Sequence, residues 1–281
     1  MSVFVVGSLH LDVVLRAPHL PGVDETVTGS AVDYVFGGKG GNQALAAARM
    51  GANVLFAGRA GSDRFGDMIR ETLGDTRIDL TQLQRDAGPS GMSAAIVDRN
   101  GDYGAVIVSA ANLNIDAEAI EVPGGTSVVV LQNEVPEAVN VIVAQKARAA
   151  GAQVWLNAAP ARPLPDALID AADVLIVNRV EAEFYADKVG SRRLLTTLGA
   201  EGVAFEGRTW QACSVDVVST HGAGDMFVGA LAAEVDAGQS ITDAIPFAQA
   251  AAALHVSIGL SQRTQLDRPR VDAFLATQSR R

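Results

Sequence analysis

Short apolar runs alternate with segments of helical periodicity along the chain, and this alternation limits the possible folds more than any other feature. The runs lie at 3–6, 54–57, 128–131, 154–156, 174–177 and 194–197. They are apolar on both faces, as strands of a parallel sheet covered by helices are. Helical patterns lie at 42–50, 65–73, 138–150 and 165–171. This order predicts an α/β fold around a mainly parallel central sheet.

A smaller sheet is predicted within this α/β body. Residues 91–98 and 103–109 are β-rich and flank Asn100-Gly101, a pair typical of a tight hairpin turn. Residues 12–16 and 31–36 are also extended in character. We therefore expect a lid sheet drawn from about 12–36 and 91–109, beside the carboxyl edge of the main sheet.

Composition excludes several classes of protein. The chain has 281 residues, 48% of them hydrophobic, which is enough for one large α/β domain or two ordinary ones. Its net charge of −10 disfavours binding to nucleic acid by bulk charge. The single cysteine, Cys213, rules out an intramolecular disulfide. No apolar run approaches the roughly 18 residues of a membrane span. The first residues are typical of a strand rather than a signal peptide, so we expect a cytoplasmic protein.

A glycine-rich loop, Gly37-Gly38-Lys39-Gly40-Gly41-Asn42, precedes the first helical pattern. Glycines allow close backbone approach, and a helix start offers unpaired amides that could hold sugar hydroxyls or an anion. The spacing matches neither a P-loop nor a dinucleotide-binding loop. A flexible turn that caps a helix explains the same glycines equally well.

A second loop, His221-Gly222-Ala223-Gly224-Asp225, also begins a helical pattern. Its successive backbone amides could bind an anion, and Asp225 could accept a proton from a substrate hydroxyl. Taken by itself, Asp225 is better explained as an ordinary capping residue. The Gly-Ala-Gly before Asp225 makes the catalytic interpretation more competitive with the capping interpretation.

Two further motifs follow apolar runs. Asn178 and Glu181 come after 174–177, where such groups often hold the water ligands of Mg²⁺; helix capping by Asn178 is the alternative. Residues 197–202 could wrap a nucleotide or form a simple turn. Ligands of open α/β sheets bind beyond the carboxyl ends of the strands, and all four motifs are predicted there.

Taken together, these segments resemble the ribokinase-like sugar kinases, the PfkB carbohydrate kinases, with the ribokinase branch as the best match. The resemblance covers nearly the whole chain, which would then be a single kinase domain over 1–281. It rests on Gly7-Ser8 with Asp12, on 25–29, 37–42 and 157–161, on Asn178, and on 197–202 and 222–225.

The resemblance implies a three-layer α/β fold with a β lid that often pairs two subunits as a homodimer. It implies transfer of the γ-phosphate of ATP, with Mg²⁺, to a hydroxymethyl group of a small sugar. The base would be Asp225, and the anion hole would be Gly222, Ala223 and Gly224. Sugar hydroxyls would be bound by His10, Asp12, Gly38, Lys39, Asn42 and Glu134. The nucleotide site would be lined by Asn178, Thr197, Gly199 and Gly202. Glu181 would bind Mg²⁺ through a water molecule.

Four departures from the family pattern bear on the substrate and the cations. His10 stands where ribokinases usually have an asparagine, which weakens the case for ribose. Ser219 replaces an aspartate that helps bind an activating monovalent cation, which argues against K⁺ activation. Residues 258–263 lack the usual pattern near the cation and the adenine. The stretch from Asn178 to 194 is short, leaving 181–188 as the expected crossover helix.

Three functions follow in order. The first is a kinase for ribose or a related pentose. The second is a kinase for a nucleoside such as pseudouridine, or for a ketohexose. The third is a protein that binds a sugar or nucleotide and has lost turnover.

Overall fold

The computed structural model describes residues 1–189 and 193–278 and contains two sheets. The main sheet has nine strands, and all neighbours from β11 to β5 are parallel; β12 and β13 are antiparallel at one edge. In spatial order the strands are β13 (Arg208–Trp210), β12 (Val203–Phe205), β11 (Leu194–Thr197), β10 (Val174–Asn178), β9 (Gln153–Asn157), β8 (Thr126–Gln132), β1 (Ser2–Val6), β4 (Val54–Gly61) and β5 (Asp79–Asp86). The prediction of a mainly parallel sheet is confirmed.

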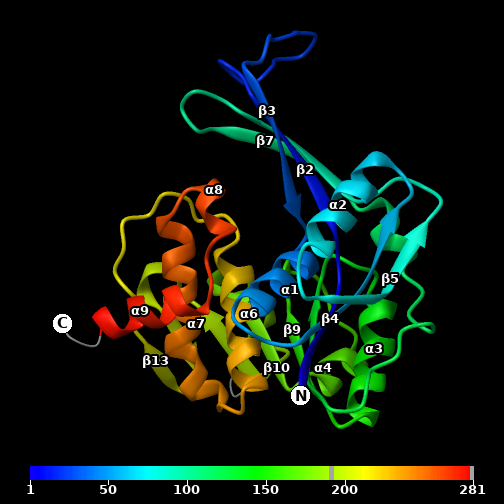
Figure 1. The fold of residues 1–281 in the computed structure, drawn as a ribbon, viewed down its shortest axis with the longest axis vertical. Coiled ribbons are helices and arrows are strands. Elements are labelled where there is room, and N and C mark those ends of the chain that lie inside the picture. Colours follow the sequence, from blue (N-terminus) through cyan, green and yellow to red (C-terminus); the bar gives the residue numbers. More distant parts are fainter. Residues whose placement is uncertain (190–192, 279–281) are drawn as a thin grey trace.

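Helices cover both faces of this sheet, as the apolar runs require (Figure 1). Val3 and Val5 face one core cluster, and Phe4 and Val6 face the other, so β1 is buried on both sides. Complete burial of such a side chain contributes roughly 1.5–3 kcal/mol to folding. One face packs against α1 (Lys39–Arg49), α2 (Arg64–Gly74), α6 (Ala223–Asp236), α7 (Ile241–Ser257) and α9 (Arg268–Gln278). The other packs against α3 (Glu137–Ala149), α4 (Asp166–Ala171) and α5 (Arg179–Tyr185).

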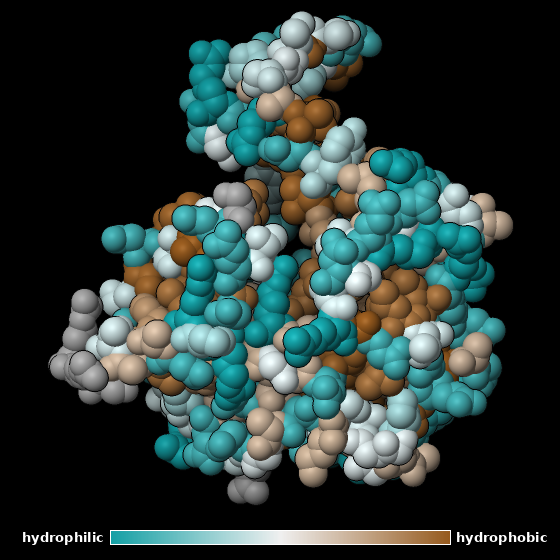
Figure 2. Space-filling model, in the orientation of Figure 1, coloured by the Kyte–Doolittle hydropathy of each residue, from teal (hydrophilic) through white to brown (hydrophobic). Residues whose placement is uncertain are grey.

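The predicted lid is a separate four-stranded sheet that projects from the body (Figures 1 and 2). Its order is β3 (Ala31–Gly37), β2 (His10–Arg16), β6 (Met92–Val97) and β7 (Tyr103–Val108). Strands β6 and β7 form the hairpin expected around Asn100-Gly101. Strand β2 begins at His10, two residues before the expected start, and this brings His10 into the lid.

The connection between β10 and β11 is shorter than the family pattern but still joins parallel strands. Within this connection, helix α5 has seven residues and runs from Arg179 to Tyr185. The expected crossover helix, 181–188, therefore begins earlier and ends earlier. Residues 190–192 lie outside the described part of the chain.

Close packing of α1 against α6 places two motifs beside each other. Gly229 on α6 lies so near Ala46 on α1 that an added Cβ would come within 2.5 Å of the Ala46 Cβ. A larger side chain at 229 would force the helices apart. This contact brings the first turn of α1 beside the first turn of α6.

The remaining short helices are α8 (Leu260–Arg263) and the 3₁₀ helices η1 (Ala110–Asn114) and η3 (Gly199–Glu201). Within residues 1–189 and 193–278, no helix is long and apolar enough to cross a bilayer.

Candidate active site

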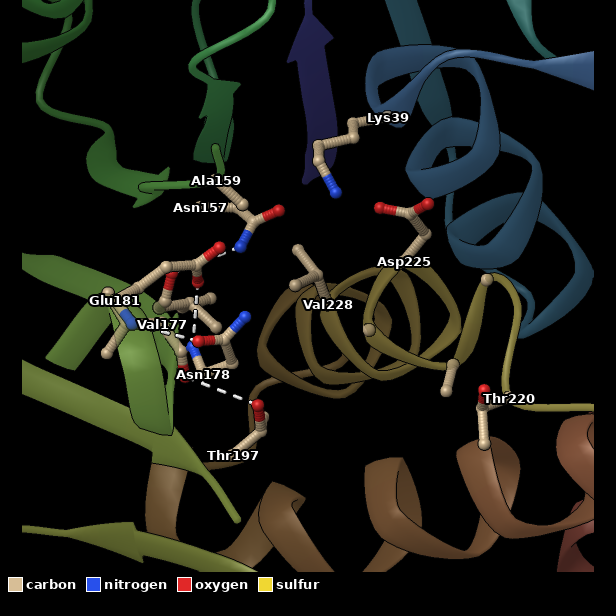
Figure 3. Close-up of a pocket in the computed structure, with 14 residues that line it drawn as sticks. Lys39, Asn157, Ala159, Val177, Asn178, Glu181, Thr197, Thr220, Asp225 and Val228 are labelled. Atoms are coloured by element: carbon tan, nitrogen blue, oxygen red, sulfur yellow. Dashed lines mark hydrogen bonds between the residues drawn. The ribbon is translucent and has the colours of Figure 1, made fainter. Parts of the chain in front are cut away.

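A cavity of about 260 Å³ lies at the carboxyl ends of the central strands, close to the lower end of typical ligand sites. Lys39 and Asp225 face each other at one end, and Asn178, Glu181 and Thr197 gather at the other (Figure 3). The structure therefore brings eight predicted residues to one cavity: Lys39, Asn178, Glu181, Thr197, Gly222, Ala223, Gly224 and Asp225.

Asp225 is in the first turn of α6 and is only 8% exposed. Its Oδ1 accepts a hydrogen bond from Gln43 Nε2 at 2.9 Å, and its Oδ2 accepts one from Asn42 Nδ2 at 3.3 Å. Both donors come from α1, more than 180 residues away in sequence. The carboxylate is thus oriented by tertiary contacts rather than by local capping.

Burial raises the pKa of Asp225 above its ordinary value. The charge of Lys39 and the donors Gln43 and Asn42 oppose that rise, while the carboxylate of Glu134 adds to it. A carboxylate with a raised pKa is a stronger base than a free aspartate. This environment is therefore suited to accepting a proton.

Gln43 is a site residue that the sequence motifs did not single out. Its Nε2 also donates to Asn157 Oδ1 at 3.0 Å, and its Oε1 accepts from Gln132 Nε2 at 2.9 Å. Gln43 and Gln132 are fully buried. The sequence pattern could have identified Gln43, because it lies at helical spacing from the apolar residues Ala47 and Met50, which are buried. A polar residue on an apolar helix face needs buried partners.

The first turn of α1 is held by Glu134. Its Oε2 accepts from the Lys39 backbone amide at 2.8 Å and from Ser8 Oγ at 2.5 Å. Helix α1 begins at Lys39 with Gly38 as the N-cap, three residues before the expected start at Asn42. Residues 39–42 therefore form the first turn of the helix rather than a loop before it. Glu134, Gly38, Lys39 and Asn42 lie together at this helix start.

His10 and Asp12 reach the same helix start from the lid. On β2, His10 pairs with Gly37 of β3, and Asp12 Oδ1 accepts from Ser93 Oγ on β6 at 2.6 Å. His10 is 4% exposed, and its Nε2 has no hydrogen-bond partner among the described residues. Neither residue lines the cavity itself.

Asn178 and Glu181 form a capping box at the start of α5. Asn178 Oδ1 accepts from the Glu181 amide at 2.9 Å, and Glu181 Oε2 accepts from the Asn178 amide at 2.8 Å. The capping alternative is therefore realised, with both residues still lining the cavity. Thr197 Oγ1 donates to the Val177 carbonyl at 3.2 Å and joins β11 to β10.

Gly199 is the first residue of η3 and Gly202 is its C-cap, and neither lines the cavity. A Cβ on Gly202 would lie 1.9 Å from the Trp210 carbonyl oxygen. The close approach of β13 therefore explains this glycine as a turn residue, independently of any nucleotide.

The amides before Asp225 differ from the expectation of three free donors. The Ala223 amide donates to the Thr220 carbonyl at 3.2 Å. Within the described residues, the Gly222 and Gly224 amides make no hydrogen bond. Two of the three predicted amides are therefore available to an anion at the start of α6.

The described acidic side chains offer Mg²⁺ single carboxylates rather than a complete set of protein ligands. No group of three or more histidine, cysteine, aspartate or glutamate side chains in the described part of the chain could hold a metal ion directly. Glu181 has one carboxylate oxygen committed to the capping box. Its second oxygen suits a water ligand of Mg²⁺, an ion that usually keeps several waters and is also held by substrate phosphates.

The sequence and the fold match known kinases. A family model described as "pfkB family carbohydrate kinase" matches residues 1–266. The ribokinase of Bacillus subtilis is 32% identical over 271 residues, which cover 91% of this chain and 92% of that protein.

Solved ribokinase structures match almost the whole chain. The Thermotoga maritima ribokinase has a TM-score of 0.89 at 27% identity, covering 98% of this chain and 99% of that one. The Arabidopsis thaliana ribokinase, solved with ribose and ATP, has a TM-score of 0.87 at 28% identity, covering 98% of each chain. With the matched family model, these likenesses show that the chain belongs to the PfkB family of carbohydrate kinases, which are phosphotransferases.

Proposed function

We propose that the protein transfers the γ-phosphate of ATP to a hydroxymethyl group of a small sugar, with ribose or a related pentose as the acceptor. One observation carries this proposal: the buried carboxylate of Asp225 faces Lys39 across the cavity, beside two unbonded amides at the start of α6. This combination provides a base and an anion site within one cavity.

In the proposed reaction Asp225 accepts the proton of the sugar hydroxyl. The hydroxyl oxygen forms a bond to the γ-phosphorus, and the bond from that phosphorus to the bridging oxygen breaks, leaving ADP. The Gly222 and Gly224 amides would stabilise the charge on the transferring group, as the positive end of a helix dipole favours.

We place the sugar against the start of α1 and the lid. The hydroxyls would be held by His10, Asp12, Gly38, Lys39, Asn42 and Glu134. The contacts of Glu134 and Asp12 support this placement, because each carboxylate has one oxygen engaged with the protein and a second oxygen without a described partner. Carboxylates accept hydrogen bonds from sugar hydroxyls readily.

We place the nucleotide at the other end of the cavity, against Asn178, Thr197 and the Gly199–Gly202 turn. Mg²⁺ would supply charge neutralisation to the phosphates, and Glu181 would orient one of its waters. The capping box supports this role because it fixes the Glu181 side chain at the cavity wall.

His10 keeps a second acceptor class open. Its buried Nε2 has no partner in the part of the chain that the structure describes, so a substrate hydroxyl or carbonyl would supply one. A nucleoside such as pseudouridine or a ketohexose offers such groups. We rank this below a pentose, and we rank a binding protein without turnover last because Asp225 and its donors are all in place.

We also propose a homodimer formed through the lid. Strand β7 is exposed along its whole length, and Tyr103, Val106 and Ile107 are each more than 60% exposed. Figure 2 shows apolar side chains on this projecting sheet. An apolar surface on a sheet edge is typical of an interface. Light scattering should give the mass of two chains for the wild type and of one chain for Val106→Lys.

The test of the proposed function is product formation from ATP and Mg²⁺ with a panel of pentoses, ketohexoses and nucleosides, each with and without K⁺. Mass spectrometry should show one strong phosphorylated pentose. A phosphorylated nucleoside or ketohexose would instead support the second function. Stabilisation by the panel without any product would support the binding protein.

A further inference from the structure

Arg263 is a buried cation that the site described above does not use. It ends α8 and is 5% exposed, yet no carboxylate pairs with it among the described residues. Its Nη1 donates to the His221 carbonyl oxygen at 2.8 Å and its Nη2 to the Ser219 carbonyl oxygen at 2.9 Å. Burying an unpaired charge is costly, so these two carbonyls are its main compensation.

The two carbonyls precede residues that line the cavity. Thr220 follows Ser219, and Gly222 follows His221. The carbonyl oxygen and the next amide hydrogen belong to one planar unit and point in opposite directions in a trans peptide. Both peptides are trans. By holding the carbonyls of 219 and 221, Arg263 therefore turns the amides of Thr220 and Gly222 away from itself.

The same loop is fastened by uncharged groups of α7. His255 contacts the His221 carbonyl through Nε2 at 3.0 Å. Burial and the nearby Arg263 lower the pKa of His255 to about 4, so at neutral pH it is an uncharged donor. The Val256 carbonyl accepts from the amides of Val218 and Ser219 at 2.8 and 3.1 Å. Of the groups that hold this loop, Arg263, His255 and the Val256 carbonyl, only Arg263 is charged.

We propose that Arg263 is a resident cation that positions the Ser219–Gly222 loop, and with it the amide donors at the start of α6. The proposal rests on the proposed kinase function and deepens it. Grouped carbonyl oxygens in a buried place are satisfied by a cation or by water. Here a side chain supplies the cation, so the loop requires no alkali ion. Arg263 does not line the cavity and acts through the loop as a positioning residue.

The first test compares Arg263→Met and Arg263→Lys with the wild type. The methionine variant should lose about 10- to 100-fold in kcat, less than the roughly 10²- to 10³-fold lost when an anion donor is deleted, because here the donors are displaced; the KM for sugar should be unchanged. Lysine should retain part of the rate, because it keeps the charge but lacks the fork that reaches two carbonyls. Millimolar guanidinium chloride should partly restore the methionine variant.

Arg268→Ala is the matched control. Arg268 also donates to a backbone carbonyl, that of Met50 at 3.0 Å, but it pairs with Glu234 away from the cavity. Its loss should lower thermal stability without a kcat response to guanidinium. Rescue of both variants alike, or a methionine variant with more than half of the wild-type kcat, would overturn the proposal.

The wild type provides a test that does not depend on folding of a variant. Its rate should be equal in potassium and tetramethylammonium chloride at the same ionic strength, and several-fold activation by K⁺ would contradict a resident cation. Calorimetric binding of a non-hydrolysable ATP analogue that keeps the γ-phosphate needs no acceptor and can be compared between wild type and Arg263→Met. If no sugar is phosphorylated, the proposed function fails, while weaker binding of the analogue by the variant would still support the role of the loop. Equal binding of the analogue in that case would overturn the role of the loop.

Discussion

The two ends of the cavity are built in different ways. At the base end, Asp225 receives hydrogen bonds from residues 182 and 183 positions away, all supplied by the packing of α1 on α6. At the other end, Asn178 and Glu181 bond to each other across three positions. The first arrangement exists only in the folded protein, whereas the second can form with the first turn of a helix.

This difference matches the chemistry proposed for each end. A base needs an environment that burial and distant charges provide, and burial does raise the pKa of Asp225. Holding a phosphate or a water needs only a fixed polar group, which a local capping box supplies. Substitutions at the base end should therefore change kcat and the pH dependence of the rate, whereas substitutions at the other end should mainly change local stability.

Asp225→Asn should have the largest effect. Loss of the base should lower kcat by about 10³-fold, within the range for general base catalysis, while sugar binding changes much less. Single-turnover kinetics and calorimetry would measure the two effects. Asp236→Asn, at the far end of the same helix, is the control. Equal turnover in Asp225→Asn and wild type would remove Asp225 as the base.

Gln43→Leu should come next and would reveal how far the base end depends on distant contacts. We expect kcat to fall by about 10- to 30-fold and unfolding free energy by about 1–3 kcal/mol, because buried partners lose their donor. The Gln43 donor lowers the pKa of Asp225, so its loss raises that pKa. Since the base must be deprotonated, the acidic limb of the pH–rate profile should move to higher pH.

Gln249→Leu controls for loss of a buried amide, because Gln249 donates to the Trp210 carbonyl outside the cavity. It should be destabilised without any displacement of the pH profile. An unmoved acidic limb in Gln43→Leu would show that the hydrogen bond does not tune the base.

Lys39→Ala should weaken apparent sugar affinity by about 10-fold, as loss of one charged hydrogen bond does. The acidic limb should again move to higher pH, since the charge of Lys39 lowers the pKa of Asp225. Initial-rate kinetics over a pH range would measure both. Lys146→Ala, on α3, should leave the KM for sugar unchanged. Unchanged affinity in Lys39→Ala would exclude Lys39 from the sugar site.

Asn178→Ala should have the smallest effect on catalysis. Removing the cap should cost about 1 kcal/mol of stability and raise the KM for ATP only a few-fold. Ser240→Ala removes the N-cap of α7 and should match the loss of stability without changing that KM. A drop in kcat as large as that of Gln43→Leu would erase the distinction between the two ends.

Much of this architecture could be predicted from local patterns. The apolar runs predicted the central strands, and Asn100-Gly101 predicted the lid hairpin. The glycine-rich loop and Asp225 could be assigned to helix starts because capping and glycine preferences act over a few residues.

Other features required the tertiary structure. Gln43 is one polar residue in an alanine-rich helix, and only the folded structure places it against Asp225. The need for glycine at 202 comes from the approach of β13, because an added Cβ would lie 1.9 Å from the Trp210 carbonyl oxygen. Arg263 lies in a segment without the usual family pattern. Its hydrogen bonds to the Ser219 and His221 carbonyls join residues more than 40 positions apart.

The sequence by itself determined the parallel central strands, the lid hairpin and the family, because these depend on periodicity and on short motifs. Only the tertiary structure decided which side chains meet Asp225, which carbonyls meet Arg263 and which amides stay free. Those pairings depend on how closely α1, α6, α7 and α8 pack, and that packing is set by side chains far apart in the chain.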